Sequence, residues 1–181
     1  MKKLTIYQMA TCAIMAALMC ILGPLSIPIG PVPVSLTNLV VLLAAVLLGA
    51  KLSTVSAVVY ILLGLVGLPV FSGFQGGVAK LAGPTGGYII GFIFLSFISG
   101  LFFEKTNGRL VLSAVGMVIG TAVLYLFGTI WFVLMMDCDV AYALSVCVVP
   151  FIPFDLVKIV IALFLGKAIR SALGKAGLIE V

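Results

Sequence analysis

Long apolar stretches, separated by short segments that carry most of the charged, glycine and proline residues, dominate this chain. A helix that crosses a membrane needs about 20 mostly apolar residues, and the stretches are of that order. The pattern predicts an all-α integral membrane protein whose six transmembrane helices form a single membrane domain over residues 1–181. The expected spans are residues 5–22, 36–49, 52–67, 86–104, 110–136 and 141–170.

Two connections between these spans are unusual. Residues 23–35 contain four prolines, and residues 67–87 contain seven glycines and two prolines, yet both segments are mainly apolar. Neither can be regular helix throughout. Because irregular backbone near a membrane is tolerated where protein buries it or where it lines a cavity, both segments are expected to close over a site. Pro150 and Pro153 predict a break within the last span.

The composition agrees with a membrane protein. Hydrophobic residues make up 64% of the chain and charged residues 8%, and the mean hydropathy is +1.43. Soluble domains have about 25% charged residues, so a water-soluble fold is excluded. Histidine is absent and the four cysteines form no CxxC pair, which argues against a metal site. The sequence has no nucleotide-binding motif and no catalytic constellation, so we do not expect an enzyme.

The positions of the basic residues predict the orientation. If both termini lie in the cytoplasm, the outer side keeps only Lys80, and Lys158 falls within the last span. This asymmetry follows the positive-inside rule, and the reversed orientation would violate it. The net charge of +5 is therefore an orientation signal, and nucleic acid is not an expected partner. The expected cytoplasmic residues are Lys2, Lys3, Lys51, Lys105, Arg109, Lys167, Arg170 and Lys175.

Asp155 and Lys158 are ionisable residues that lie within the last predicted span, about a turn or two from its outer start. They are three residues apart, so they project from one face of the helix. Charged groups in a membrane are costly and usually face an interior or a cavity. Three interpretations remain open, namely a self-neutralising ion pair, a proton or ion relay, and a site for a polar ligand, of which the ligand site is favoured.

The glycine-rich outer segment offers a second set of candidates. Lys80 precedes residues 83–87, where a Gly-Pro-Thr-Gly-Gly turn opens the fourth span with free backbone N–H groups. A cation and such groups can hold an anion together. Phe71, Phe74 and Tyr88 can pack against a ligand, although aromatic residues near a membrane interface often serve only as anchors.

Small residues at helical spacing form a further feature. Ala13 and Ala17 lie on the first span, and the pairs Gly87/Gly91 and Gly116/Gly120 repeat the four-residue spacing. Such faces let helices approach closely, either within the chain or against a partner.

Four segments, in this order, resemble the BioY family, the biotin-specific substrate-binding subunits of energy-coupling factor (ECF) transporters. The first is GPVPVSL, the next two are GLPVFSGFQGG and AGPTGGYIIGF, and the last is FIPFDLVK. The resemblance covers nearly the whole chain. Phe154 and Thr37 depart from it, since the family usually has glycine and glutamine at these two positions.

The resemblance implies a fold like that of ECF S components, with six helices in a prokaryotic plasma membrane and both termini inside. It implies biotin as the transported ligand, no bound cofactor, and three protein partners: a transmembrane coupling protein and two cytoplasmic subunits that hydrolyse ATP. It also implies that coupling helices pack on Ala13 and Ala17. The implied ligand contacts are Asp155 and Lys158, with Lys80, Tyr88, Gly86, Gly87, Thr85, Gln75 and Ser35 in the other motifs.

Two other function classes stay open. One is a small secondary transporter or channel that works alone on another polar solute, with Asp155 and Lys158 as a coupling pair. The other is a membrane scaffold in which this ion pair is purely structural.

Overall fold

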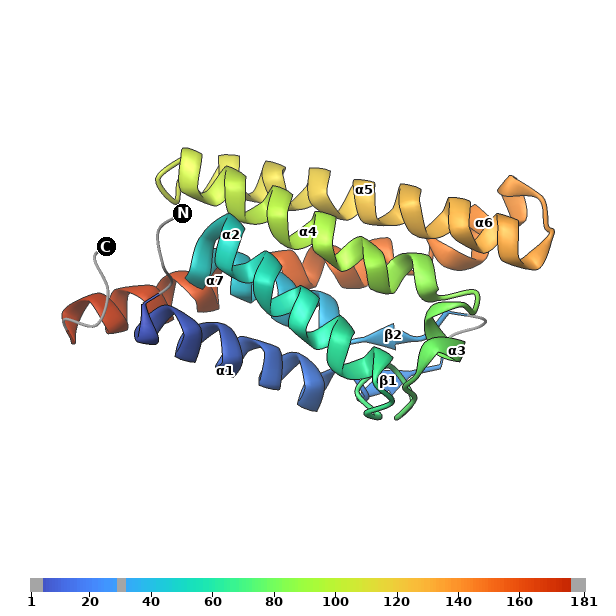
Figure 1. The fold of residues 1–181 in the computed structure, drawn as a ribbon. Coiled ribbons are helices and arrows are strands. Elements are labelled where there is room, and N and C mark those ends of the chain that lie inside the picture. The colour runs from blue at the N-terminus through green and yellow to red at the C-terminus, as the bar shows by residue number, and fades with distance from the viewer. Residues whose placement is uncertain (1–4, 29–31, 177–181) are drawn as a thin grey trace.

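A computed structural model of the chain describes residues 5–28 and 32–176. The regular elements of this part of the chain are helices apart from two strands of two residues each, in agreement with the all-α prediction, and the helices form one elongated bundle (Figure 1). The elements are α1 (Ile6–Leu22), β1 (Ser26–Ile27), β2 (Val34–Ser35), α2 (Thr37–Leu65), α3 (Val78–Leu81), α4 (Gly86–Lys105), α5 (Leu110–Met136), α6 (Val140–Cys147) and α7 (Ile152–Lys175).

Helix α1 begins where the sequence places a capping box. The Thr5 hydroxyl accepts a hydrogen bond from the backbone N–H of Gln8, and the Gln8 side chain accepts one from the backbone N–H of Thr5. These reciprocal bonds satisfy two donors that the start of a helix leaves free. The helix ends before Gly23 and Pro24, as the predicted span 5–22 does.

Helix α2 joins the second and third predicted spans, 36–49 and 52–67, through a sharp break. Gly49 has φ +73° inside it, a backbone conformation that favours glycine. The Glu104 carboxylate accepts a hydrogen bond from the backbone N–H of Ala50, the first residue after the break. The chain enters α2 from β2 and leaves it toward α3 at the same end of the bundle, so the two limbs run in opposite directions (Figure 1).

The last predicted span, 141–170, is also broken. Helices α6 and α7 meet at a bend of 47° around residues 148–151. Pro150 lies in this bend, and Pro153 occupies the first turn of α7, where its missing N–H costs no helical hydrogen bond. The predicted break is therefore present, and α7 continues to Lys175, beyond the expected end of the span.

The two irregular connections lie side by side at the end of the bundle opposite the described chain ends (Figure 1). Strands β1 and β2 pair antiparallel. In the other connection, Phe71 and Gln75 form an isolated β-bridge, and the backbone N–H of Gly73 donates a hydrogen bond to the carbonyl of Pro24. The bond between Gly73 and Pro24 ties the two connections to each other.

Length and hydropathy identify three described helices, α2, α4 and α5, as able to cross a membrane. The bent pair α6–α7 is a fourth candidate, and α1 is a shorter apolar helix of 17 residues. Because α2 reverses at Gly49, each of its limbs is shorter than a typical span of about 20 residues.

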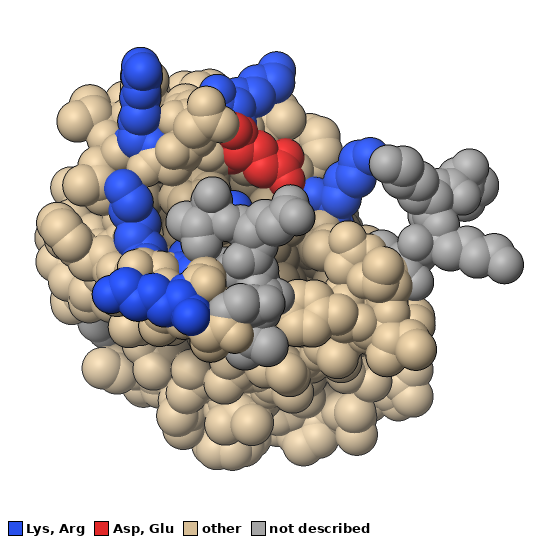
Figure 2. Space-filling view, turned by 90° about the vertical axis from the view of Figure 1, so that its left-hand side faces the viewer, with Lys and Arg blue, Asp and Glu red and all other residues tan. Residues whose placement is uncertain are grey.

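The described basic residues gather at the end of the bundle where the break in α2, the α4–α5 turn and the end of α7 meet (Figure 1). Figure 2 looks onto this end and shows Lys and Arg side chains spread over it, with one small acidic area among them. Lys80 on α3 lies at the opposite end, and Lys158 lies within α7. Lys2 and Lys3 fall outside the described residues.

Glycines set the close contact between α4 and α5. Gly87 and Gly91 of α4 face Trp131 and Leu124 of α5 so closely that an added Cβ would overlap these side chains. Gly116 and Gly120 of α5 lie equally close to α4, against Phe102, Leu95 and Ser99. The two glycine pairs therefore serve packing within the chain.

Candidate ligand-binding site

A cavity lies between the helices at the end of the bundle where the two irregular connections meet. Its walls come from β2, both limbs of α2, the connection after α2, and the facing parts of α4, α5, α6 and α7. It contains about 590 Å³ of space without atoms, part of which opens to the outside. The part of this space that the centre of a water molecule can occupy is only about 60 Å³. Its polar lining residues are Ser35, Thr37, Asn38, Tyr60, Ser72, Thr85, Tyr88, Tyr125, Asp155 and Lys158.

Asp155 and Lys158 meet inside this cavity as an ion pair. The break before Ile152 restarts the helix, which puts Asp155 in the first turn of α7 and Lys158 on the same face. The Lys158 Nζ donates a hydrogen bond to Asp155 Oδ1 over 2.9 Å. Only 2% of Asp155 and 7% of Lys158 is exposed. The positive end of α7 adds to the field that stabilises the carboxylate.

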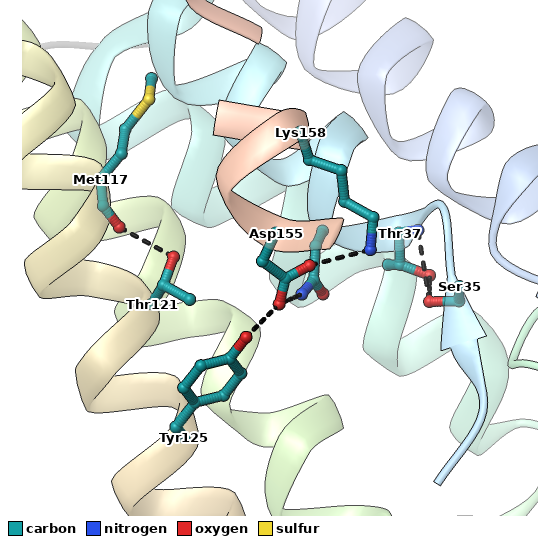
Figure 3. Close-up of polar contacts among 8 residues, drawn as sticks. Ser35, Thr37, Met117, Thr121, Tyr125, Asp155 and Lys158 are labelled. Carbon is teal, nitrogen blue, oxygen red and sulfur yellow. Dashed lines mark hydrogen bonds and ion pairs between the residues drawn. The ribbon is translucent and has the colours of Figure 1, made fainter. Parts of the chain in front are cut away.

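The second carboxylate oxygen of Asp155 is held from two other helices. The Tyr125 hydroxyl on α5 donates a hydrogen bond to Asp155 Oδ2 over 2.6 Å, and the Asn38 amide on α2 donates one to the same atom over 3.2 Å. Figure 3 shows the Tyr125 phenol meeting the carboxylate on the side away from Lys158. Asp155 is thus an acceptor for donors from α2, α5 and α7.

Ser35 and Thr37 form a polar wall beside Lys158 (Figure 3). The Ser35 hydroxyl donates a hydrogen bond to Thr37 Oγ1 over 3.0 Å and accepts one from the backbone N–H of Thr37. These bonds join the end of β2 to the start of α2. The expected contact residue Ser35 therefore lines the cavity, as does Thr37.

Thr85 and Tyr88 line the opposite wall at the start of α4. The Tyr88 hydroxyl shares a hydrogen bond of 3.0 Å with Thr129, and the edge of its ring lies against Gly128, where an added Cβ would overlap it. Thr85 makes no capping hydrogen bond to α4. Phe71 closes this region and is fully buried, whereas Phe74 is 67% exposed and lies outside the cavity.

Gly86 and Gly87 lie next to the cavity wall without lining it. An added Cβ at Gly86 would collide with the carbonyl of Leu81, and one at Gly87 would collide with Trp131. The indole N–H of Trp131 also donates a hydrogen bond to the carbonyl of Gly83 over 3.0 Å. These contacts hold the turn before α4 against α5. Ligand contact by the two glycines stays a prediction.

Lys80 and Gln75 lie in a separate shallow hollow beside the cavity. Thr85 lines both spaces, so it stands between Lys80 and the Asp155–Lys158 pair. Partial burial lowers the pKa of the Lys80 ammonium below its ordinary value. The structure does not bring Lys80 into the cavity, and its expected contact with a ligand stays a prediction.

A family model described as the BioY family matches residues 1–175. The chain belongs to the BioY family. It is 42% identical over 165 residues to the "Biotin transporter BioY" of Thermotoga maritima, and the matched region covers 91% of this chain and 96% of that protein. It is 37% identical over 164 residues to the "Probable biotin transporter BioY" of Pyrococcus horikoshii, with the same coverage.

The likeness extends to three dimensions. A crystal structure of the S component for biotin from an ECF-type ABC transporter matches with a TM-score of 0.86 and 31% sequence identity. The match covers 93% of this chain and 95% of that chain. Family membership and fold agree with the resemblance that the four motifs indicate.

The two departures from the usual BioY motifs fall in different places. Thr37 is buried and lines the cavity, so its replacement of a glutamine changes the wall itself. Phe154 is 47% exposed and does not line the cavity. Only the first departure therefore changes the lining of the cavity.

Sequence reasoning missed Asn38 and Tyr125. Each is an isolated polar residue in an apolar helix, and polar residues inside a membrane helix usually face the interior. That signal identifies them as candidates but does not name a partner, because Asp155 lies 117 residues from Asn38 and 30 from Tyr125.

Proposed function

We propose that this chain is a membrane-embedded biotin-binding subunit that delivers biotin for uptake through an ATP-driven ECF transporter. One observation carries the proposal: a buried Asp155–Lys158 pair faces a cavity in a chain 42% identical to a biotin transporter over nearly its whole length. An ion pair that only neutralised itself would not need to border an open cavity.

The chemistry of biotin matches the cavity. Its cyclic urea has two N–H donors and one carbonyl acceptor, and its thioether ring and alkyl chain are apolar. The Asp155 carboxylate accepts a hydrogen bond from a urea N–H, and the Lys158 ammonium donates one to the urea carbonyl. Ser35 offers a further hydroxyl to the urea. Phe71 and Tyr88 give the ring and chain apolar surfaces to pack against.

The carboxylate of biotin is directed toward the outer opening in this proposal. Thr85 borders both the cavity and the hollow that contains Lys80 and Gln75, so a flexible chain passing Thr85 reaches a cation and an amide. Gly86 and Gly87 open α4 and contribute backbone N–H groups at the positive end of that helix. Lys80 then neutralises the carboxylate.

The chain crosses a prokaryotic plasma membrane six times with both ends in the cytoplasm. The spans are α1, the two limbs of α2, α4, α5 and the bent pair α6–α7. Support comes from the reversal at Gly49 and from the basic residues at one end of the bundle. The short limbs of α2 are accommodated because protein buries them on most sides.

A transmembrane coupling protein and two ATPase subunits complete the transporter. The residues of α1 that point away from the bundle include Ala13 and Ala17, both exposed, flanked by exposed Ile14 and Ile21. Small side chains on an exposed face allow a partner helix to approach closely. The coupling helices therefore pack against this face of α1.

The first test measures biotin binding by the purified chain alone. Asp155→Asn keeps the shape of the side chain but removes its charge, and Lys158→Met keeps the stem but removes the donor. Loss of a charge-assisted bond in a buried site costs about 2–5 kcal/mol, so each variant should bind biotin at least about 30-fold more weakly. Normal biotin affinity in both folded variants would make the pair structural.

Experiments on the same purified chain distinguish the proposed function from the two other function classes. A scaffold shows no saturable binding of biotin by the wild-type chain. A transporter that works alone moves labelled biotin or another solute into liposomes without ATP or partners. The proposed function requires saturable binding by the chain alone, and ATP-dependent uptake when the coupling protein and ATPases are present.

A further inference from the structure

The Asp155 carboxylate accepts hydrogen bonds from two residues in addition to its ion-pair partner Lys158. Lys158 donates to Oδ1, whereas Tyr125 and Asn38 both donate to Oδ2. The three donors come from three helices, and Tyr125 meets the carboxylate on the side away from Lys158 (Figure 3). An ion pair alone leaves a carboxylate free to turn about its last side-chain bond, whose preferences are broad. Donors on both oxygens remove that freedom.

Tyr125 makes the shortest of these contacts. Its O–H···O distance of 2.6 Å is in the range of charge-assisted bonds to a carboxylate, whereas the Asn38 contact of 3.2 Å is long. Among the hydrogen bonds of the described residues, the Tyr125 hydroxyl donates to Asp155 and to no other group. Tyr125 also lines the cavity, so this bond is made at the wall that a ligand meets.

We propose that Tyr125 is a positioning residue that turns the Asp155 carboxylate so that its remaining lone pair, on Oδ1, points into the cavity, toward a ring N–H donor of the ligand. This inference rests on the proposed function, because it takes the urea of biotin as the donor. A fixed acceptor also gives selectivity. A ligand without the matching N–H leaves the carboxylate unpaired in a buried site, and such a mismatch is strongly rejected.

A double-mutant cycle tests whether Tyr125 acts through Asp155. Tyr125→Phe keeps the ring and removes only the donor, and it should weaken biotin binding about 10-fold in the wild-type background. In the Asp155→Asn background, the same change should alter the affinity less than about twofold. Equal losses in both backgrounds would overturn the proposal, because Tyr125 would then contact biotin itself or support the fold.

Tyr60→Phe is the matched control for this cycle. Tyr60 is a buried cavity-lining tyrosine that donates to the carbonyl of Val70 and makes no bond to Asp155. Its substitution should cost the same in both backgrounds. Thermal unfolding of each variant in detergent checks that it is folded.

The selectivity between biotin and a modified biotin gives a second measurement. It does not require the affinity of the weakly binding Asp155→Asn variant. The wild-type chain should prefer biotin over biotin methylated on the urea nitrogens, and Tyr125→Phe should reduce this preference about fivefold or more. If Tyr125→Phe weakens both ligands equally, its role is structural and the proposal is wrong. A wild-type chain that binds neither ligand would instead refute the proposed function.

Discussion

Asp155 and Lys158 are charged residues that the bundle removes almost completely from solvent. Taking two charges out of water costs several kcal/mol per ion, and their attraction offsets this cost only if further hydrogen bonds satisfy the pair. Tyr125 and Asn38 supply such bonds to the carboxylate, but Lys158 has no second acceptor among the hydrogen bonds of the described residues. The ammonium therefore retains donors for a ligand carbonyl, which explains why the pair lies at a cavity.

Lys80 allows a prediction about pH. Partial burial lowers the pKa of its ammonium, so the side chain carries its charge below that pKa and loses it as the pH rises, earlier than an ordinary lysine does. If Lys80 neutralises the biotin carboxylate, biotin affinity should fall on the alkaline side. Lys80→Ala should bind about fivefold more weakly at neutral pH, a loss of about 1 kcal/mol for a half-exposed charge pair.

Lys80→Arg is the matched variant in this experiment, because a guanidinium does not deprotonate in proteins. Its biotin affinity, measured by equilibrium binding from neutral to alkaline pH, should stay constant where the wild-type affinity falls. Lys80→Ala should show no pH dependence over the same range. An alkaline loss of affinity in all three proteins would assign the effect to another group.

How well a contact between two residues can be predicted from the sequence depends on how far apart they lie along the chain. The pairing of Asp155 with Lys158 follows from helix periodicity alone, because residues three apart share a face. Tyr125 and Asn38 reach Asp155 only through the packing of α5 and α2 against α7, which no local pattern encodes. Lys80 was expected beside the ligand from its charge, but its position relative to the cavity depends on the path of an irregular connection.

At the scale of helices, two breaks organise the bundle. Gly49 reverses α2, and the Glu104 carboxylate accepts from the backbone where the second limb begins. Pro150 and its neighbours bend the last span, so that α7 begins inside the protein with Asp155 in its first turn. The sequence indicates both breaks, since the freedom of glycine to adopt a positive φ and the restriction that proline places on a helix are local properties of the chain. The small sheet β1–β2 and the short α3 were not predicted, because tertiary contacts define them.

The contact between α2 and α4 gives a prediction about stability. Gly100 of α4 lies against the backbone of Ala50, and an added Cβ would come within 2.6 Å of the Ala50 Cα. Backbone cannot move aside as a side chain can, so Gly100→Ala should destabilise the fold by about 1–3 kcal/mol through overpacking. The expected result is a lower midpoint of thermal unfolding in detergent.

Ala122→Leu serves as the control for this measurement. Ala122 is exposed on α5, and a larger apolar side chain there meets detergent or lipid. Its unfolding midpoint should stay near that of the wild type. A Gly100→Ala variant as stable as Ala122→Leu would mean that α2 and α4 are not held in close contact.

At the scale of the whole molecule, the two ends of the bundle differ in charge and in regularity. The basic end contains tight turns and helix ends, and the other end contains the long connections and the cavity (Figures 1 and 2). The hydropathy pattern predicts the helices well, because apolar stretches of this length have few alternatives in a bilayer. It cannot predict where a cavity forms, since that depends on how the helices pack.

Topology follows from this asymmetry. We expect Lys80 outside the cell and Arg109, in the α4–α5 turn, inside it. Single cysteines at these positions, in a chain whose own four cysteines are replaced, should react differently with a membrane-impermeant thiol reagent on intact cells. Position 80 should label before lysis and position 109 only after it. Labelling of position 109 on intact cells would exclude a six-span chain with both ends in the cytoplasm.

The last prediction separates biotin binding from transport. Ala13 and Ala17 are exposed on α1, away from the cavity-lining residues, and their side chains are small. Helix association in lipid depends on close van der Waals contact, so a large side chain at either position should hold a partner helix away. Ala13→Trp and Ala17→Trp should leave biotin binding by the chain alone within about twofold of wild type. Both should abolish co-purification with the coupling protein and ATP-driven uptake.

Ala122→Trp is the matched control, because it places the same side chain at an exposed alanine on α5. It should affect neither binding nor uptake if partners dock on α1. Loss of biotin binding in the α1 variants would mean that these alanines support the fold of the site. Normal co-purification would move the docking surface elsewhere, and Gly116 and Gly120 could not provide it, since Phe102, Leu95 and Ser99 of α4 already occupy that face of α5.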